Sequence, residues 1–316
     1  MQKSKIKEVI LAITYQCNSR CQMCNIWKMT NPQSLSLKSI EKIPGDLRDI
    51  NITGGEPFLS RDIVKIVKTL SDKSPQASFI ISSNGFATEL ILAKMKEILE
   101  INPQVGVAIS IDGIDEKHDA VRGILGGFQK SLATIEGLQK MGVKKLRLSF
   151  TLGDYNVSEL KPVYALAENL GIELSLTLVH SSEQYFNTQN FVTQKDEMII
   201  VLDWLIEKEL SSWNIKKWLR AYYAYGMKVL LLEGKRMLPD YSGQEGIFID
   251  PNGDIFPSDI SSQKLGNLGG FDFSAMHKIN LEKPAPSWMI CTARTAIRKH
   301  WFKAGVWILR NKFLSF

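Results

Sequence analysis

Six repeats of a short apolar run followed by a longer amphipathic segment constrain the fold of this chain more than any other feature. The runs are rich in Ile, Val and Leu and have the length of buried strands. The expected strands occupy 8–14, 49–53, 78–82, 105–110, 145–150 and 172–179. The expected helices occupy 61–73, 88–100, 128–141 and 157–170, with Gly142 and Gly171 as terminators. Alternation of this kind predicts an α/β fold in which a parallel sheet is covered by helices, either an open sheet or a partial (β/α)6 TIM-like barrel. We adopt the barrel as the expectation.

The pattern changes after residue 190, where the strand–helix alternation stops. Two helical stretches at 195–210 and 213–234 are followed by a hairpin-like segment at 246–259, whose Asn252 and Gly253 suit a tight turn. A smaller α+β C-terminal extension is therefore expected behind the barrel. The predicted divisions are a core at 1–190, a helical connection at 191–235, a hairpin region at 236–283 and a basic amphipathic helix at 284–316.

Composition narrows the class of protein. With 44% hydrophobic and 23% charged residues, the 316-residue chain is globular, which excludes intrinsic disorder and a collagenous fibre. The sequence contains no run of about 18 apolar residues and no signal-peptide pattern at its start, so a cytoplasmic location is expected. Four cysteines are too few for a disulfide scaffold in a chain of this length.

Polar or small residues follow nearly every predicted strand. Because the carboxyl ends of parallel strands meet on one face, these residues are candidates for a shared site. They are Thr53, Gly54, Gly55 and Glu56 after the second strand, Ser83 and Asn84 after the third, Ser110 and Asp112 after the fourth, and Val179 and His180 after the sixth. Any one of these loops could equally be an ordinary polar turn.

Three of the four cysteines gather after the first strand. Cys17, Cys21 and Cys24 follow the spacing C-x-x-x-C-x-x-C, which supplies three thiolate ligands in one compact loop. Three ligands are one short of a closed zinc site or a fully ligated iron–sulfur cluster, so they leave an open metal position. A structural zinc site would more often combine two C-x-x-C pairs, and Cys291 is too distant in the sequence to be assumed as a fourth ligand.

The segment CNSRCQMC at 17–24 and the segment TGGEP at 53–57 together resemble the radical S-adenosylmethionine (radical SAM) superfamily. The resemblance covers roughly residues 7–180 and includes the order, spacing and strand context of both motifs. One position departs from the family pattern, because Met23 replaces the aromatic residue that usually precedes the third cysteine. A thioether can still pack against a purine ring.

The resemblance implies a cofactor set and a reaction. Cys17, Cys21 and Cys24 would hold one 4Fe-4S cluster, whose fourth iron binds S-adenosylmethionine. An external electron donor such as flavodoxin or ferredoxin would reduce the cluster. Cleavage of S-adenosylmethionine would then yield a 5'-deoxyadenosyl radical that abstracts hydrogen from substrate, while the protein places the reactants and excludes water.

The resemblance also implies which residues contact S-adenosylmethionine. Gly54 and Gly55 would let the backbone approach it, and Glu56 would accept hydrogen bonds from its ammonium group. The remaining implied contacts are Ser83, Asn84, Ser110 and Asp112 to the ribose or carboxylate, Arg122 to the carboxylate, and Val179 against adenine. Each has a plainer interpretation: the polar residues as turn or capping groups, Arg122 as a solvated loop residue and Val179 as core.

The segment at 247–268 resembles the SPASM or twitch extension found behind many radical SAM domains, but without its cysteines. Ser258 stands where a cysteine is expected, so we expect no auxiliary cluster. Cys291 is then either a buried inert thiol or a hydrogen-atom donor. His180 is the candidate proton-transfer group with the best position, and Glu183, Tyr185 and Asp250 are further candidates.

The last segment carries the net charge of the chain. It contains no Asp or Glu, and its six positive charges equal the formal net charge of +6. These charges are Arg294, Arg298, Lys299, Lys303, Arg310 and Lys312. Such a helix resembles an interfacial anchor for an anionic membrane or a lid over an acidic substrate, and it could instead dock on the core. No nucleic-acid partner is expected, because no recognised binding domain accompanies the basic segment.

Three functional hypotheses follow. The leading one is a radical SAM enzyme that acts on an organic substrate, with lipid, isoprenoid and glycan intermediates as candidates. The second is a peptide-modifying or protein-modifying maturase of the SPASM type, which the Arg122 motif and the extension favour. The third is a noncatalytic metal-binding module. An intact open ligand set argues against the third hypothesis.

Overall fold

The computed structural model describes residues 5–282 and 286–313. All six predicted strands form, and each begins and ends within two residues of the expected position. They are β1 (Glu8–Ala12), β2 (Asp49–Thr53), β3 (Ser78–Ser83), β4 (Gly106–Ser110), β5 (Leu146–Leu152) and β6 (Glu173–Leu178). The helices that follow them are α1 (Leu37–Ile40), α2 (Ile63–Lys73), α3 (Thr88–Ile101), α4 (Glu116–Arg122), α5 (Gly127–Lys140) and α6 (Leu160–Asn169). Gly142 and Gly171 have φ angles of 76° and 67°, which confirms them as helix terminators.

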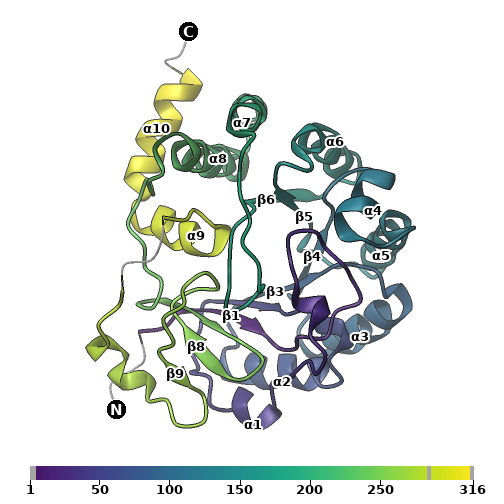
Figure 1. Cartoon of the computed structure of the whole chain (residues 1–316), viewed down its shortest axis with the longest axis vertical. Coiled ribbons are helices and arrows are strands. Elements are labelled where there is room, and N and C mark those ends of the chain that lie inside the picture. The colour runs from purple at the N-terminus through teal and green to yellow at the C-terminus, as the bar shows by residue number, and fades with distance from the viewer. Residues whose placement is uncertain (1–4, 283–285, 314–316) are drawn as a thin grey trace.

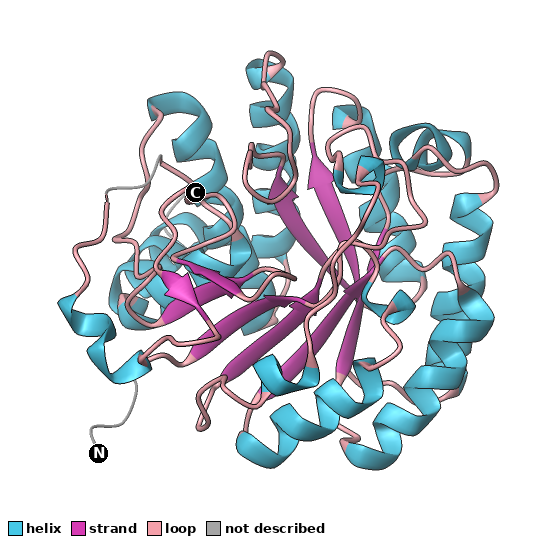
Figure 2. Ribbon diagram, turned by 60° about the horizontal axis from the view of Figure 1, so that its bottom comes forward, coloured by secondary structure: helices cyan, strands magenta, loops and turns pink. Residues whose placement is uncertain are grey.

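The six strands are parallel and lie in chain order from β1 to β6, so they form the predicted partial barrel (Figure 2). Side chains alternate between its two faces. In β5, every second residue from Leu146 onward is fully buried against the helices, and the residues between are half-buried and line the interior. The outer face is therefore apolar, whereas much of the inner face is polar.

The hairpin of the expected extension joins the same sheet. β7 (Gly246–Ile249) pairs in parallel with β1, and β8 (Asp254–Phe256) and β9 (Gly266–Asn267) continue the sheet in antiparallel order. The nine-stranded order is β6-β5-β4-β3-β2-β1-β7-β8-β9. The hairpin thus extends the barrel wall beyond β1, a long-range pairing that local sequence patterns do not reveal.

In the described part of the C-terminal half there are four α-helices, of which the first two lie close to their predicted positions. These are α7 (Lys195–Ser211), α8 (Ile215–Glu233), α9 (Ile290–Lys299) and α10 (Trp301–Phe313). The single helix predicted over 284–316 is wrong, because the chain breaks at His300 into α9 and α10. Residues 284, 285 and 314–316 of that prediction, and residues 1–4 of the predicted core, lie outside the described residues. Within the described ranges, no helix has the length and apolar character needed to cross a membrane.

Helix α9 lies between α8 and the β7–β9 hairpin, on the open side of the barrel (Figure 1). Trp288, just before α9, donates from its indole Nε1 to the Tyr223 carbonyl oxygen at 2.9 Å. Gly226 on α8 permits this approach, because a Cβ there would overlap the Trp288 ring. Arg236 also holds the start of α9, donating to Thr292 and to the Ser287 carbonyl oxygen.

Candidate functional site

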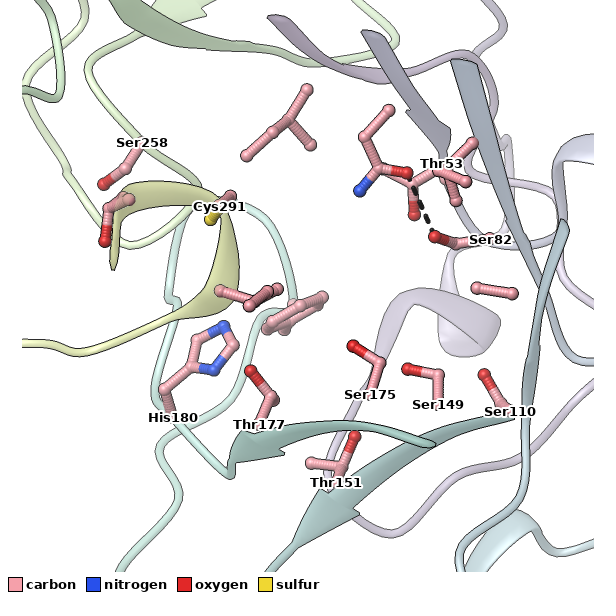
Figure 3. Close-up of a pocket in the computed structure, with 18 of the residues that line it drawn as sticks. Thr53, Ser82, Ser110, Ser149, Thr151, Ser175, Thr177, His180, Ser258 and Cys291 are labelled. Carbon is pink, nitrogen blue, oxygen red and sulfur yellow. Dashed lines mark hydrogen bonds between the residues drawn. The ribbon is translucent and has the colours of Figure 1, made fainter. Parts of the chain in front are cut away.

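A cavity of about 350 Å³ occupies the barrel interior and gathers most of the predicted site. The loop bearing Cys17, Cys21 and Cys24 lines one end of it. Glu8 and Asp49, the first residues of β1 and β2, line the other end. Between them, the inner faces of the strands and the start of α9 form the wall (Figure 3). The carboxyl-end site expected for parallel strands is thus continuous with the whole barrel interior.

The three predicted cysteine ligands all line this cavity. The Ser19 backbone N–H donates to Cys17 Sγ at 3.4 Å, and the Ser19 hydroxyl lies 3.0 Å from Cys21 Sγ. Burial raises the pKa of Cys17 and Cys24 to about 12, so a bound cation is needed to favour their thiolate forms. Among the described residues, no three His, Cys, Asp or Glu side chains are arranged around a single-ion site. Three thiols in one loop can supply the three protein ligands of an iron–sulfur cluster that keeps one iron open.

The glycines of the TGGEP segment lie against the backbone of the cysteine loop. Gly54 has φ 151°, and a Cβ there would come within 2.5 Å of the Thr14 carbonyl oxygen. The Gly55 N–H donates to that same carbonyl at 2.7 Å. The two glycines therefore have a structural role, because they let the end of β2 and the start of the cysteine loop pack together. They also line the cavity.

Glu56 does not line the cavity, which differs from its predicted role as a direct ammonium acceptor. Its carboxylate is fully buried and accepts hydrogen bonds from the Asn84 N–H at 2.7 Å, the Phe58 N–H at 3.1 Å and the Ser83 hydroxyl at 3.0 Å. Burial raises the pKa of Glu56 to about 7, although the hydrogen bonds from these three donors act to lower it. Glu56 thus fixes the end of β3, where Ser83 and Asn84 themselves line the cavity.

Arg122 and Asp112 form a buried ion pair, with 2.5 Å between Arg122 Nη2 and Asp112 Oδ2. The Arg122 side chain is only 11% exposed and ends α4, so the solvated-loop interpretation is wrong. Its other amino group, Nη1, donates to Cys21 Sγ at 3.5 Å. Asp112 is fully buried, does not line the cavity, and accepts from the Thr151 N–H at 2.7 Å. Asp112 therefore positions Arg122 beside the cysteine loop rather than facing a ligand itself.

The last strand-end candidates, Ser110, Val179 and His180, all line the cavity. His180 Nε2 lies 3.3 Å from Asp259 Oδ2, and its Nδ1 lies 3.2 Å from the Leu178 carbonyl oxygen. Burial lowers the pKa of His180, but the hydrogen bond and charge of Asp259 outweigh it, so the pKa is raised. The sequence analysis missed Asp259, because a hairpin residue 79 positions away carries no local signal of this pairing.

Cys291, the fourth cysteine, faces the same cavity from α9 (Figure 3). Burial raises its pKa well above the usual thiol range, so it is held as the neutral thiol. Ser258, which stands where an extension cysteine was expected, is also part of the cavity wall. Cys291 is thus near the reaction space, but it is one thiol without a second cysteine beside it in the described chain.

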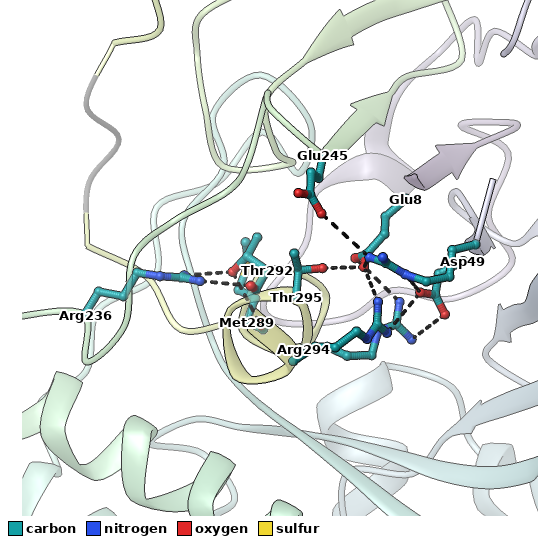
Figure 4. A network of polar contacts seen from close by, with 10 residues as sticks. Glu8, Asp49, Arg236, Glu245, Met289, Thr292, Arg294 and Thr295 are labelled. Atoms are coloured by element: carbon teal, nitrogen blue, oxygen red, sulfur yellow. Dashed lines mark hydrogen bonds and ion pairs between the residues drawn. The ribbon is translucent and has the colours of Figure 1, made fainter. Parts of the chain in front are cut away.

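The basic residues of α9 are paired with acidic residues of the barrel (Figure 4). Arg298 binds Glu8 at 3.1 Å and Asp49 at 3.2 Å, Arg294 lies 3.5 Å from Asp49, and Lys299 pairs with Glu245. Docking on the core is therefore correct for α9, but the solvated basic face expected with it is wrong, because these charges pair with acidic residues of the protein.

The fold and the site together define an α/β barrel protein with an open three-cysteine site at the mouth of a polar cavity. The profile of the Radical SAM superfamily matches residues 11–167. The chain belongs to the radical SAM superfamily, whose members are enzymes that use a 4Fe-4S cluster and S-adenosylmethionine.

Individual relatives are distant. A probable GTP 3',8-cyclase of Sulfurisphaera tokodaii is 27% identical over 55% of this chain and 56% of its own length. The mycofactocin maturase MftC of Mycobacterium ulcerans is 28% identical over 62% of this chain and 54% of its own length. The chain thus spans little more than half the length of these relatives. The solved structure of native anSMEcpe with bound AdoMet superimposes with a TM-score of 0.65 at 14% identity, covering 96% of this chain and 100% of that one, which shows the shared fold.

The residues present fit the family's cofactors. Three thiols from one loop line one end of the cavity, which matches the three protein ligands of a cluster with one open iron. Ser83, Asn84, Ser110 and Val179 line the adjoining wall, where polar hydrogen-bonding groups and one apolar side chain suit the ribose and adenine of S-adenosylmethionine.

Proposed function

We propose that this protein is an enzyme that reductively cleaves S-adenosylmethionine and abstracts hydrogen from an organic substrate held in the barrel. The observation that carries the proposal is that the three cysteines, Cys291 and the predicted S-adenosylmethionine contacts other than Glu56 and Asp112 all line one cavity. A reduced 4Fe-4S cluster would supply the electron for this cleavage, with an external flavodoxin or ferredoxin as its source.

In this scheme the chain's own residues bind the cofactors, orient them and exclude water. Cys17, Cys21 and Cys24 would hold the cluster, and Arg122, fixed by Asp112, would place a positive charge beside it. That charge suits the carboxylate of S-adenosylmethionine. The barrel wall and α9 enclose the cavity, which limits the access of water to reactive species.

The reaction needs a residue that completes it after hydrogen abstraction, and we assign this role to Cys291. Its buried neutral thiol can transfer a hydrogen atom to a substrate radical, which breaks the S–H bond and leaves a cysteinyl radical. One electron from the external donor and one proton would restore the thiol. His180, held in a raised-pKa state by Asp259, is the nearby group suited to supply the proton.

The hairpin β7–β9 is proposed as the remnant of a SPASM or twitch extension without its auxiliary cluster. Ser258 occupies the cavity wall where a ligand cysteine would be needed, and Cys291 cannot hold a cluster alone. A peptide substrate is the second candidate, supported by the similarity to the maturase MftC. A small organic substrate is favoured because the cavity measures about 350 Å³ and the ion pairs of Glu8 and Asp49 lie at its far end.

The exposed face of α10 is a candidate for peripheral membrane contact. Trp301, Phe302 and Leu309 are 71%, 68% and 56% exposed, and Lys303 lies on the same helix. Aromatic and basic residues on one helix suit an anionic lipid surface. Sedimentation with vesicles containing phosphatidylserine should show binding that Trp301→Ser with Phe302→Ser reduces. Equal sedimentation of both proteins would reject the membrane contact.

The central test is anaerobic reconstitution with iron and sulfide, followed by a count of metal and an assay for 5'-deoxyadenosine. We expect about four irons per chain, the content of one cubane cluster, and cleavage that Cys21→Ala abolishes. The matched control is Cys291→Ala, which should retain both iron and cleavage. Bound zinc without cleavage would reject the proposed function, and about eight irons would reject the assignment of a single cluster.

A further inference from the structure

Hydroxyl groups line the inner wall of the barrel from β2 to β6 (Figure 3). They come from alternate positions of the strands, which is why they share one face. The residues are Thr53, Ser82, Ser110, Ser149, Thr151, Ser175 and Thr177. The same strands also contribute apolar side chains to the wall, Ile80 and Ala108 among them, and β1 contributes Ile10.

Several of these hydroxyls make no hydrogen bond to another described residue. They belong to Ser110, Ser149, Thr151 and Ser175, which come from three neighbouring strands. Their half-buried position in the cavity leaves them available to a ligand. A ligand that removes them from water without replacing those hydrogen bonds would bind at a cost, whereas a ligand with its own hydroxyls would satisfy them.

Arg147 adds a positive charge to this wall, at the end of the cavity where β5 begins. It precedes Ser149 and Thr151 on the inner side of β5, near the amino end of the strand. In the described ranges it forms no ion pair, and burial together with repulsion from Arg294 lowers its pKa. A guanidinium does not lose its proton in proteins, so a half-buried one without an ion pair favours the arrival of an anion.

The acidic groups near Arg147 are engaged by other cations. Glu8 and Asp49 form ion pairs with Arg48, Arg294 and Arg298. Glu173, the acidic residue that acts on Arg147, is about half exposed and pairs with Lys216 and Arg220. Among the described residues at this end of the cavity, Arg147 is therefore a cation without an ion pair, whereas the two carboxylates that line it, Glu8 and Asp49, are both paired.

We propose that the barrel binds a small, hydroxyl-rich molecule that carries one anionic group, a phosphate or a carboxylate, with the anion on Arg147. Hydroxyls of the ligand pair with Ser149, Thr151 and Ser175, and its C–H faces pack on Ile80 and Ala108. A sugar phosphate or sugar acid has this chemistry, whereas an isoprenoid or fatty acyl chain would desolvate the hydroxyls without pairing them. The proposal rests on the proposed function in that this molecule is the substrate.

The test measures equilibrium binding of four probes to the reconstituted protein in the presence of S-adenosylmethionine. The probes are glucose 6-phosphate, glucuronate, glucose and geranyl diphosphate. Glucose 6-phosphate or glucuronate should bind most tightly, and the better of the two identifies the anion. Removal of a charge-assisted hydrogen bond should weaken that probe roughly tenfold to hundredfold in Arg147→Gln, with partial recovery in Arg147→Lys.

Matched variants separate the contributions. Ser149→Ala with Ser175→Ala should weaken both charged sugars and glucose alike, because it removes hydroxyls and no charge. Lys144→Gln, an exposed change just before β5, should leave all affinities unchanged. Tighter binding of geranyl diphosphate than of the sugars, binding by no sugar, or equal binding by wild type and Arg147→Gln would overturn the proposal.

Iron content and release of 5'-deoxyadenosine are measured on the same preparations. Sugar binding without a cluster or cleavage would reject the proposed function but retain the ligand assignment. A cluster and cleavage without sugar binding would retain the proposed function but reject the ligand assignment.

Discussion

Glu8→Gln tests whether ion pairs hold α9 against the barrel. One carboxylate oxygen of Glu8 accepts from Arg48 at 2.5 Å, from Arg298 at 3.1 Å and from the Thr295 hydroxyl. The amide retains the acceptor oxygen but removes the negative charge. Three arginines would then share Asp49 as the remaining carboxylate on the adjacent strand.

The expected loss of stability follows from burial. Breaking a buried ion pair costs about 3–5 kcal/mol, and the Glu8 side chain is only 8% exposed. Its arginine partners are 38–39% exposed, however, so solvent screens part of each interaction. We therefore expect a loss of about 2–3 kcal/mol in the free energy of unfolding. For a chain of 316 residues the melting temperature should fall by roughly 3–5 °C.

Thermal unfolding followed by circular dichroism measures this effect on wild type and variant side by side. The control is Asp72→Asn, which breaks the Lys68–Asp72 pair, where both side chains are 62% exposed. That change should cost no more than about 0.5 kcal/mol. The Glu8→Gln variant should also show faster proteolysis after residue 286, because α9 is held less firmly. A melting temperature equal to that of the control would refute the role of the network.

Three further predictions concern the site. Gly55→Ala should lower the iron content after reconstitution, because its Cβ would come within 2.8 Å of the Tyr15 carbonyl oxygen and displace the cysteine loop; unchanged iron would contradict this. Burial raises the pKa of Glu56 from 4.5 to about 7, so the stability it contributes is fully present below pH 4.5 and is lost as pH rises through 7. The Glu56→Gln variant should not lose this stability when its free energy of unfolding is measured against pH. The same pH profile for variant and wild type would count against the prediction. Asp259 raises the pKa of His180 above 6.5, so the stability of this pair is present below pH 6.5 and is lost as pH rises through the raised value. Asp259→Asn should lower the His180 midpoint in an NMR titration, and an unmoved midpoint would exclude the interaction.

Much of the fold could be predicted from local patterns. Apolar runs and helical periodicity located all six barrel strands, and the order of the motifs predicted which loops share one face. The short helix α4 was missed, because its seven residues, EKHDAVR, are mostly polar and show no clear apolar stripe. As a result, Arg122 was placed in a loop, although it ends a helix and is buried.

The sequence predicted which residues lie at the candidate site better than it predicted how they are arranged there. The cysteines, Ser83, Asn84, Ser110, Val179, His180 and Cys291 all line the cavity as candidates should. Glu56 and Asp112 instead lie behind it and support neighbouring groups. Residue type and strand position indicate that a side chain is near the site, but they do not indicate which neighbours compete for its oxygens.

The sequence by itself determined the βα succession, the open cysteine motif and the family, because these depend on residue type and short spacing. It also determined that the net charge lies in the C-terminal segment. Only the tertiary structure decided where that charge goes: Arg294 and Arg298 meet Glu8 and Asp49, about 250 to 290 positions away in the chain. Ion pairs across such separations depend on how helices and sheet pack, and periodicity carries no record of that packing. Three of the six positive charges of the C-terminal segment, those of Arg294, Arg298 and Lys299, are therefore compensated around α9, and Arg147 adds a positive charge at the same end of the cavity.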